Sequence, residues 1–384
     1  MAIATAETTR RSRSSTTSGR RWCPHVWEGC TFAAWMRALI RNRFRVGWRQ
    51  WWVAAVITAV SMVHSALRLI QQLVYGGRIR RTKLRQPPIF IIGHWRTGTT
   101  LLHELMVLDE RHTFPTSYEC FEPNHFLLTE KLFTKVLWFL APTQRPMDNM
   151  ATGWDHPQED EFALCMLGQP SPYWTIAFPN NGPPNPKYYD LEGLSPRALS
   201  QWKTAFMRFL QTITVRKRKR LVLKSPPHTC RVKVLKEMFP DAVFIHIVRN
   251  PYVVFASTMN LWKSLYRHQG LQTPTFEGLE DQVFETYLHM HKKLDETRHL
   301  VDEDHFYEIR YEDLVRDPVG EMRALYEQLN LGGFDAVLPR LENYLASVAG
   351  YETNRYELTP ELRARIRRKW GASIERYEYE AANY

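Results

Sequence analysis

The sequence is poor in cysteine and has no recognisable secretory signal. Its five cysteines among 384 residues are odd in number and scattered, at Cys23, Cys30, Cys120, Cys165 and Cys230. Such a set argues against a disulfide scaffold and favours a reducing compartment. No apolar core followed by a small-residue cleavage site stands near the start. We therefore expect a protein that is cytoplasmic or membrane-associated.

Acidic residues are scarce in the first 85 positions. That segment holds 16 Lys and Arg residues but only two acids, Glu7 and Glu28, a balance of +14. The remaining 299 residues hold 35 basic and 38 acidic side chains, a balance of −3, so the net charge of +11 is an N-terminal property. A groove for polynucleotide across the main domain is not indicated, and no nucleic-acid partner is expected.

The N-terminal region divides into a tail and a helical extension. Residues 1–21 are rich in Ser, Thr and Arg and nearly free of apolar side chains, which predicts a disordered tail. Residues 22–86 are predicted to form a basic helical extension, in which the first 17 residues of Trp51–Tyr75 could just reach across a bilayer. Polar residues recur along this segment at spacings of three and four and form one stripe on a helix: Thr58, Ser61, Ser65, Arg68 and Gln72, with His64 and Gln71 beside them.

Three interpretations of this helix remain open. It can lie in a membrane interface, with the stripe and the basic residues between 41 and 85 contacting an anionic headgroup surface. It can pack its broad apolar face on the main domain. It can also span the bilayer, although basic residues on both sides give insertion no preferred direction.

From Pro87 onward, short apolar runs alternate with helical segments. Strands are expected at residues 87–93 (PPIFIIG), Arg220–Ser225, Ala242–Arg249 and His305–Leu314. Because strands separated by helices form parallel sheets covered on both faces, the sequence predicts an α/β fold. We expect a three-layer, P-loop-like domain with a central parallel sheet over residues 87–384, preceded by the N-terminal helical extension.

The stretch GHWRTGTT nearly matches the phosphate-binding loop G-x-x-x-x-G-K-[ST] but lacks its lysine, because that position is Thr99. Glycines let the backbone wrap an anion at the start of a helix, where amide groups and the helix dipole hold it. The usual lysine serves the β- and γ-phosphates of a nucleoside triphosphate. A ligand without a γ-phosphate, such as a 5′-phosphosulfate, does not need it. Arg96 adds charge to this loop, and Thr97, Thr99 and Thr100 add hydroxyl donors.

A second segment, VRNPYVVFAS, places Arg249 at the end of a predicted strand and Ser257 eight residues later. Open α/β sheets bind ligands at such strand ends. Arg249 and Ser257 can therefore hold a dianionic phosphate through charge-assisted hydrogen bonds.

These two segments resemble the motifs of sulfotransferases that use 3′-phosphoadenosine 5′-phosphosulfate (PAPS). Arg96–Thr100 matches the pattern R-[ST]-G-T-[ST], and the strand ending in Arg249 with Ser257 matches the 3′-phosphate motif. The resemblance covers about Pro87 to Glu380 and is closest to the branch with the membrane-bound tyrosylprotein sulfotransferases and their bacterial relatives. It implies transfer of a sulfuryl group from PAPS to an acceptor hydroxyl, with no metal.

The resemblance also implies roles for individual residues. The 5′-phosphosulfate would be bound by Arg96, Thr97, Gly98, Thr99 and Thr100, and the 3′-phosphate by Arg249 and Ser257. Lys224, in LVLKSPPH, matches a lysine that serves the departing phosphosulfate oxygen, so the cation missing at Thr99 would come from a neighbouring strand.

The catalytic base is expected among acids and one histidine on the acceptor side. Glu119 is the first candidate, because relatives carry a glutamate a little over twenty residues after the loop arginine and Glu119 stands 23 after Arg96. Glu122, His125 and the acids at 159–161 remain alternatives. The last group also fits the first turn of a helix, where acids complement the dipole. The acceptor stays open among lipid, carbohydrate, tyrosine and phenol.

Two other functions remain to be weighed. A P-loop kinase-like phosphotransferase is disfavoured by the missing lysine and by the lack of an obvious magnesium-binding acid at a strand end. A non-catalytic membrane-surface protein with a retained nucleotide fold is disfavoured because Arg96, Lys224, Arg249 and Ser257 are all present.

Overall fold

A computed structural model describes residues 25–136, 153–182, 185–348 and 356–379. Parallel strands form one sheet in the order β2-β3-β1-β4-β5. Their bounds are β1 Ile89–Ile92, β2 His112–Thr113, β3 Arg220–Lys224, β4 Val243–Val248 and β5 Phe306–Arg310. Strand β1 lies between β3 and β4, so the segments that follow these three strands emerge side by side at one edge. The predicted 1–21 tail lies outside the described residues.

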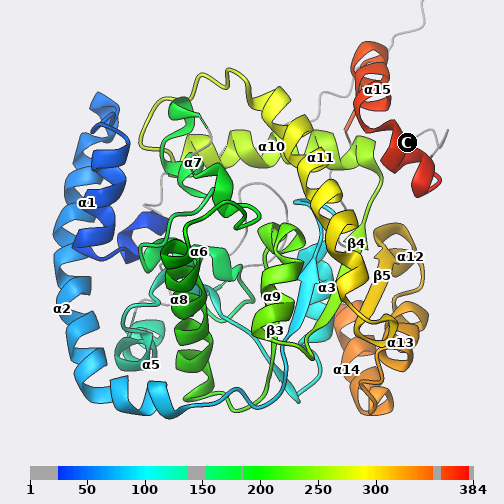
Figure 1. The fold of residues 1–384 in the computed structure, drawn as a ribbon, viewed down its shortest axis with the longest axis horizontal. Helices are drawn as coiled ribbons and strands as arrows, with labels where there is room; N and C mark the ends of the chain where they lie inside the picture. The colour runs from blue at the N-terminus through cyan, green and yellow to red at the C-terminus, as the bar shows by residue number, and fades with distance from the viewer. Residues whose placement is uncertain (1–24, 137–152, 183–184, 349–355, 380–384) are drawn as a thin grey trace, which may run out of the picture.

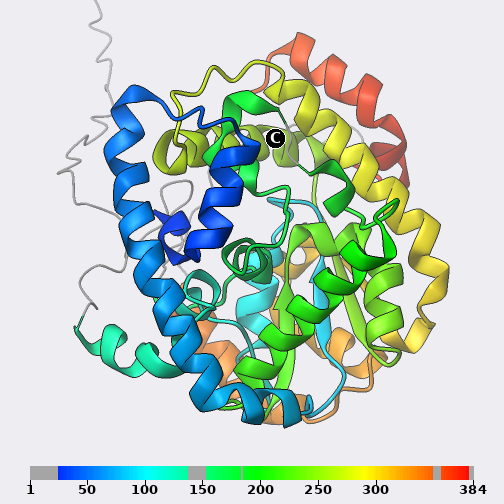
Figure 2. The ribbon, with the colours of Figure 1, turned by 60° about the vertical axis from the view of Figure 1, so that its left-hand side comes forward.

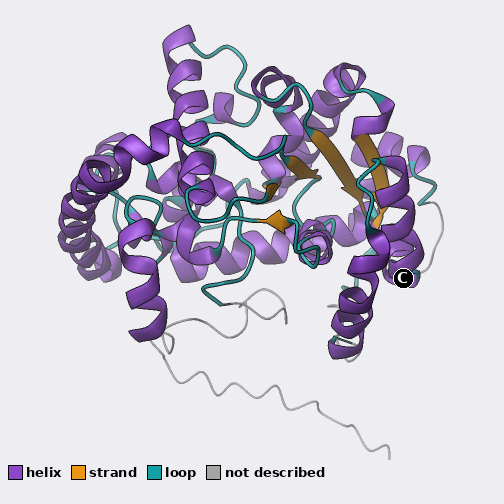
Figure 3. Ribbon diagram, turned by 90° about the horizontal axis from the view of Figure 1, so that it is seen from below, coloured by secondary structure: helices purple, strands orange, loops and turns teal. Residues whose placement is uncertain are grey.

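Alternating side chains along β1 create the two packed faces of the sheet. Phe90 and Ile92 belong to a core with α8 (Pro196–Thr214) and α9 (Val232–Met238). Ile89 and Ile91 belong to a second core with α3 (Thr99–Met106), α13 (Pro318–Gln328) and α14 (Phe334–Ser347). Figure 3 shows the strands lying among helices. The predicted three-layer α/β fold with a parallel sheet is confirmed.

The remaining helices surround this sheet, and several of them lie between the sheet and the N-terminal extension (Figure 1). A third core joins that extension to helices that follow β4. These surrounding helices are α1 Phe32–Arg41, α2 Trp51–Arg81, α4 Ser117–Phe121, α5 Phe126–Val136, α6 Asp160–Met166, α7 Trp174–Ala177, α10 Pro251–Gln269, α11 Leu279–Thr297, α12 Tyr311–Arg316 and α15 Pro360–Arg376. Short 3-10 turns such as η6 Pro226–Cys230 connect some of the elements.

The strand predictions differ from the structure in two places. Strand β2 is only two residues long, too short to produce a sequence pattern, and was not expected. The strand expected at His305–Leu314 ends at Arg310, and α12 begins at Tyr311. Glu312 and Asp313, in the first turn of α12, complement its dipole there.

Helix α2 is a single 31-residue helix at the left-hand edge of Figure 1, with α1 beside it. Figure 2 shows it running along the near side of the molecule. By length and composition, the segment Trp48–Arg81 could cross a membrane, and only 28% of its most apolar window is buried. The protein therefore covers little of this apolar helix.

The polar stripe of α2 faces the protein except at Gln72, which is exposed. Thr58 Oγ1 accepts a hydrogen bond from Trp35 Nε1 at 2.9 Å. Gln71 donates to the backbone oxygen of Asn124 at 3.0 Å and accepts from the amide of Leu127 at 2.9 Å. These bonds satisfy polar groups that would otherwise be buried without partners.

The opposite side of α2 presents large apolar side chains to the outside. Leu73 is 86% exposed and Leu69 is 62% exposed. The exposed apolar set on this helix and the turn before it is Trp48, Trp51, Trp52, Met62, Val63, Leu69, Ile70, Leu73 and Val74, here called the α2 apolar face. Val53, Ala54, Ile57 and Ile79 of α2 pack in the cores of the protein, whereas the α2 apolar face stays outside, so the interpretation in which α2 packs on the domain holds for one side of the helix.

Candidate active site

The loop between β1 and α3 has a backbone that requires glycine. Gly98 has φ 102°, and a Cβ built there would lie 2.3 Å from Cδ2 of Tyr311. Arg96 also adopts a left-handed conformation, with φ 71°. Thr97 Oγ1 donates to the His94 backbone oxygen at 2.8 Å, which closes the turn. The amides at the start of α3 thus follow a tightly bent loop, the arrangement that binds phosphate.

Both predicted nucleotide-binding motifs meet at this loop. Arg96 Nε donates to Ser257 Oγ at 2.7 Å, and Arg249 Nη1 donates to the backbone oxygen of Arg96 at 3.2 Å. The Arg249 guanidinium also lies 4.0 Å from the ring centroid of Tyr311. Burial lowers the pKa of Arg249 from its usual value, because the charged guanidinium loses water there. A dianion placed here would offset that desolvation.

Lys224 lies at the end of β3, next to β1, and forms an ion pair. Its Nζ is 2.8 Å from Glu159 Oε1, and the lysine side chain is only 2% exposed. Tyr173 donates its hydroxyl hydrogen to the other carboxylate oxygen of Glu159. Trp95 Nε1, one residue before Arg96, donates to the Tyr173 hydroxyl oxygen at 3.1 Å. A chain of polar contacts therefore connects Lys224 to the phosphate-type loop.

Sequence reasoning did not identify Tyr173 or Trp95 as site residues. Tyr173 lies in SPYWTIAF, which is equally typical of core packing, and Trp95 occupies a variable position of the loop pattern. Burial raises the pKa of Tyr173 well above its usual value, and the charge of Glu159 acts in the same direction. The phenol therefore stays protonated and holds the carboxylate as a hydrogen-bond donor.

The acids at 159–161 face three basic residues, one at the end of β3 and two in the segment after it. Glu159, at the N-cap of α6, pairs with Lys224 as described. Asp160 Oδ1 is 2.8 Å from His228 Nε2, and Glu161 Oε2 is 2.5 Å from Arg231 Nη1, both pairs having fully buried side chains. Asp160 and Glu161 do lie in the first turn of α6, as one interpretation expected. Glu159 is 15% exposed and is the one of these acids that remains accessible.

Glu119 occupies a different environment. Its Oε2 accepts from the backbone amide of Thr116 at 2.9 Å, while Thr116 Oγ1 accepts from the Glu119 amide, a capping box at the start of α4. The same oxygen is 2.9 Å from Lys217 Nζ. The side chain is 1% exposed. Glu122 and His125 lie elsewhere again, in contact with His64 of α2.

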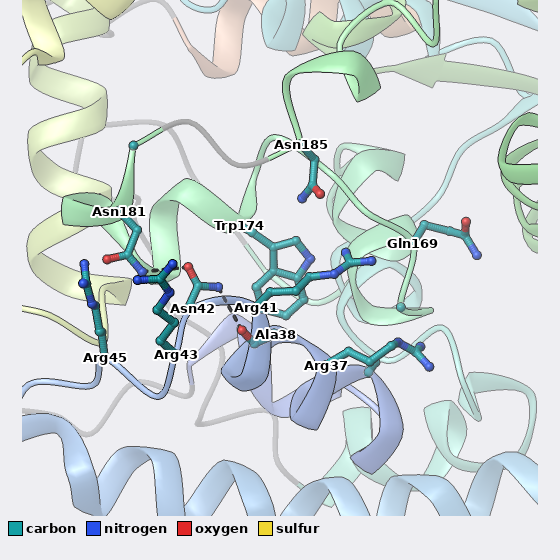
Figure 4. A pocket seen from close by; sticks show the side chains of 13 residues that line it. Arg37, Ala38, Arg41, Asn42, Arg43, Arg45, Gln169, Trp174, Asn181 and Asn185 are labelled. Carbon is teal, nitrogen blue, oxygen red and sulfur yellow. Dashed lines mark hydrogen bonds between the residues drawn. The ribbon is translucent and has the colours of Figure 1, made fainter. Parts of the chain in front are cut away.

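A basic pocket of about 330 Å³ lies between α1 and the segment around α7. Figure 4 shows arginines from α1 and the turn after it around its mouth, with α2 along the bottom of the view. Trp174 also lines the pocket, and its chain neighbour Tyr173 contacts Glu159. Two adjacent residues at the start of α7 therefore contribute one to this pocket and one to the contacts of Glu159. The lining contains no acid; its basic members are Arg37, Arg41, Arg43 and Arg45.

A family model described as "Sulfotransferase family" matches residues 87–335. The chain belongs to the sulfotransferase family. This sulfotransferase is 55% identical over 370 residues to the omega-hydroxy-beta-dihydromenaquinone-9 sulfotransferases of Mycobacterium bovis and Mycobacterium tuberculosis, covering 96% of this chain and 95% of theirs. That similarity extends well into the N-terminal extension, which the family model leaves out. The family and enzyme class predicted from the two motifs are confirmed.

Solved structures share the fold at much lower identity. The sulfotransferase STF9 from Mycobacterium avium has a TM-score of 0.62 and 18% identity, covering 90% of this chain and 96% of that one. STF1 from Mycobacterium tuberculosis has a TM-score of 0.59 and 17% identity, covering 88% and 90%. The architecture of this sulfotransferase is therefore that of known sulfotransferases over nearly its whole length.

Proposed function

We propose that this sulfotransferase moves the sulfuryl group of PAPS to the hydroxyl of a membrane lipid of the hydroxylated prenyl-quinol class. The observation that carries the acceptor class is the 55% identity, over 96% of the chain, to proteins named for omega-hydroxy-beta-dihydromenaquinone-9. The α2 apolar face supports it independently, because it offers a surface that a lipid phase would cover.

The loop and the strand ends would bind PAPS by its two anionic ends. The amides at the start of α3 and the side chain of Arg96 suit the 5′-phosphosulfate. Arg249 and Ser257, which both contact Arg96, suit the 3′-phosphate. The hydroxyls of Thr97, Thr99 and Thr100 add donors to the same loop. No residue of this set requires a metal ion to hold the substrate.

Lys224 and Glu159 would then carry the transfer. Glu159 takes the proton of the acceptor hydroxyl. The hydroxyl oxygen of the acceptor then attacks sulfur in line with the departing 5′-phosphate oxygen. One S–O bond forms to the acceptor and one breaks to the 5′-phosphate oxygen. Lys224 donates to that departing oxygen and stabilises its developing charge. The products are a lipid sulfate ester and adenosine 3′,5′-bisphosphate.

Glu159 is preferred over Glu119 as the base for a geometric reason. It directly contacts the lysine assigned to the leaving group, whereas Glu119 is engaged by its own helix cap and by Lys217. In an in-line transfer the base and the leaving-group cation lie on opposite sides of sulfur, so the Lys224–Glu159 ion pair would open when both substrates bind.

We also propose that the enzyme works on an anionic membrane surface, with the α2 apolar face in the interface. The helix holds the protein through its inward polar stripe, which leaves the apolar side for lipid. Basic residues at both ends of α2 suit anionic headgroups. The basic pocket of Figure 4 lies beside α1, which packs on α2, and suits the polar end of a lipid.

The proposal is tested by transfer of radiolabelled sulfate from PAPS into hydroxylated prenyl quinols in liposomes. Label should enter the quinol, and adenosine 3′,5′-bisphosphate should raise the melting temperature while ATP with Mg²⁺ should not. Transfer to a soluble phenol or peptide tyrosine but not to the quinol would reject the acceptor class. No thermal shift with the bisphosphate would reject the nucleotide assignment.

A further inference from the structure

Two histidines and a glutamate form a buried cluster apart from the residues assigned to sulfuryl transfer. His64 belongs to α2, Glu122 is the C-cap of α4, and His125 immediately precedes α5. Glu122 Oε2 is 3.3 Å from His64 Nδ1 and 3.1 Å from His125 Nε2. These ligand-type atoms all lie within 4.8 Å of one another. The two imidazole rings meet edge-on, with centroids 4.5 Å apart.

The three facing atoms are close but do not satisfy one another. Within the described residues, His64 Nδ1, Glu122 Oε2 and His125 Nε2 are buried and make no hydrogen bond of acceptable geometry. The His125 side chain is 1% exposed, so bulk water does not solvate its nitrogen. A buried polar atom without a partner is costly, and three that converge on one point together suit a positively charged ligand.

The hydrogen bonds around Thr129 identify which nitrogen of His125 carries the lone pair. Thr129 Oγ1 is 3.1 Å from the His125 backbone oxygen, to which it donates its single proton, and it accepts from the Tyr118 hydroxyl at 2.9 Å. It also lies 2.9 Å from His125 Nδ1, and donation by the Thr129 hydroxyl to the backbone oxygen leaves Nδ1 as the donor in that contact. The proton of a neutral imidazole is then on Nδ1, and the lone pair of Nε2 faces the carboxylate.

Two lone pairs 3.1 Å apart repel each other unless a proton or a metal ion lies between them, and the poor hydrogen-bond geometry of this contact favours the metal ion. We propose that His64, Glu122 and His125 bind a divalent transition-metal ion, with zinc as the best match. Two imidazole nitrogens and one carboxylate oxygen form a common zinc ligand set, with a fourth position for water. The Thr129 hydroxyl orients His125 in the way that outer-shell partners orient metal-bound histidines.

The position of the ligands indicates a structural role. His64 comes from the N-terminal extension, whereas Glu122 and His125 come from the catalytic domain. A bound ion would therefore fasten α2 to that domain at the middle of the polar stripe. It takes no part in the transfer step, for which no metal is expected. This proposal is independent of the acceptor and of the assignment of the catalytic base.

The test uses the full-length protein, purified without a polyhistidine tag. Metal content is measured by mass spectrometry, then the protein is stripped with EDTA and titrated with zinc chloride while the melting temperature is followed. His64→Gln removes one ligand. His305→Gln is the matched control, because Asp302, Asp304 and His305 form a similar cluster on the exposed surface. Thr129→Val removes only the orienting hydroxyl.

Wild type and His305→Gln should bind about one zinc per chain and lose melting temperature on chelation, whereas His64→Gln should do neither. Thr129→Val should bind zinc about 10–100-fold more weakly. Cobalt added to the stripped wild type should give a visible absorption band that His64→Gln lacks. If His64→Gln does not fold, the band of the wild type alone supports the site. Equal zinc in wild type and His64→Gln, or no effect of zinc and EDTA on wild type, would overturn the proposal.

Discussion

Replacing Glu159 with glutamine tests the proposed base while keeping the size and one acceptor oxygen of the side chain. Glu159 Oε1 is 2.8 Å from Lys224 Nζ, so the amide preserves a hydrogen bond to the lysine but cannot take a proton. A positioned base contributes about 10²–10⁴-fold, or about 3–5 kcal/mol of transition-state stabilisation. We expect kcat to fall by that factor at saturating PAPS, with little change in the binding of adenosine 3′,5′-bisphosphate.

Glu119→Gln is the matched control, because it makes the same chemical change in the other candidate base. Glu119 caps α4 and pairs with Lys217, whose side chain is 28% exposed, so its loss should cost about 1 kcal/mol of stability. Activity per folded molecule should remain. Transfer of labelled sulfate, measured beside a urea titration of each variant, separates the two effects. If Glu119→Gln loses activity and Glu159→Gln keeps it, the assignment of the base to Glu159 is refuted.

Four further outcomes are expected. Lys224→Ala should reduce kcat by about 10²–10³-fold in the transfer assay while the bisphosphate still raises the melting temperature, and unchanged turnover would remove its leaving-group role. Gly98→Ala should abolish that thermal shift, because its Cβ would lie 2.3 Å from Tyr311, whereas Gly77→Ala, with nothing within 4 Å, should not. Burial lowers the pKa of His94 to about 4 from 6.5, so the unfolded chain binds more protons than the folded protein between these pH values. The free energy of unfolding should therefore rise with pH across this window by up to about 3 kcal/mol. Equal urea midpoints at pH 5 and pH 7 would contradict this. Leu69→Ser with Leu73→Ser should weaken sedimentation with anionic liposomes at least about tenfold, because each leucine contributes about 1.5–3 kcal/mol of apolar burial, whereas Val315→Ser on another exposed surface should not.

The sheet and the nucleotide-type loop could be predicted because their signals are local. Four buried strands appear as apolar runs, and Gly98 marks a backbone conformation that other residues rarely adopt. The spacing of Arg249 and Ser257 reflects one strand end and the start of one helix. Such patterns survive in a single sequence because each depends on neighbouring residues.

The orientation of α2 and the pairing of the acids could not be predicted in the same way. Periodicity shows that α2 has a polar stripe, but Trp35 and Asn124, which bind it, are remote in the sequence. The partner of Glu159 likewise comes from a strand 65 residues away. For Glu119 a local signal did exist: Thr116 three residues earlier forms the capping-box pattern, which motif spacing alone overlooks.

The inward polar stripe of α2 affects how firmly this helix stays attached to the protein when its outer side lies in the hydrocarbon region of a membrane. Apolar packing gives a helix no preference between its own protein and a surrounding hydrocarbon phase, since both are equally apolar. The bonds from Thr58 and Gln71 have no competing partner in such a phase, because water is scarce there. Immersion of the outer side should thus leave the attachment of the helix at least as firm as it is in water.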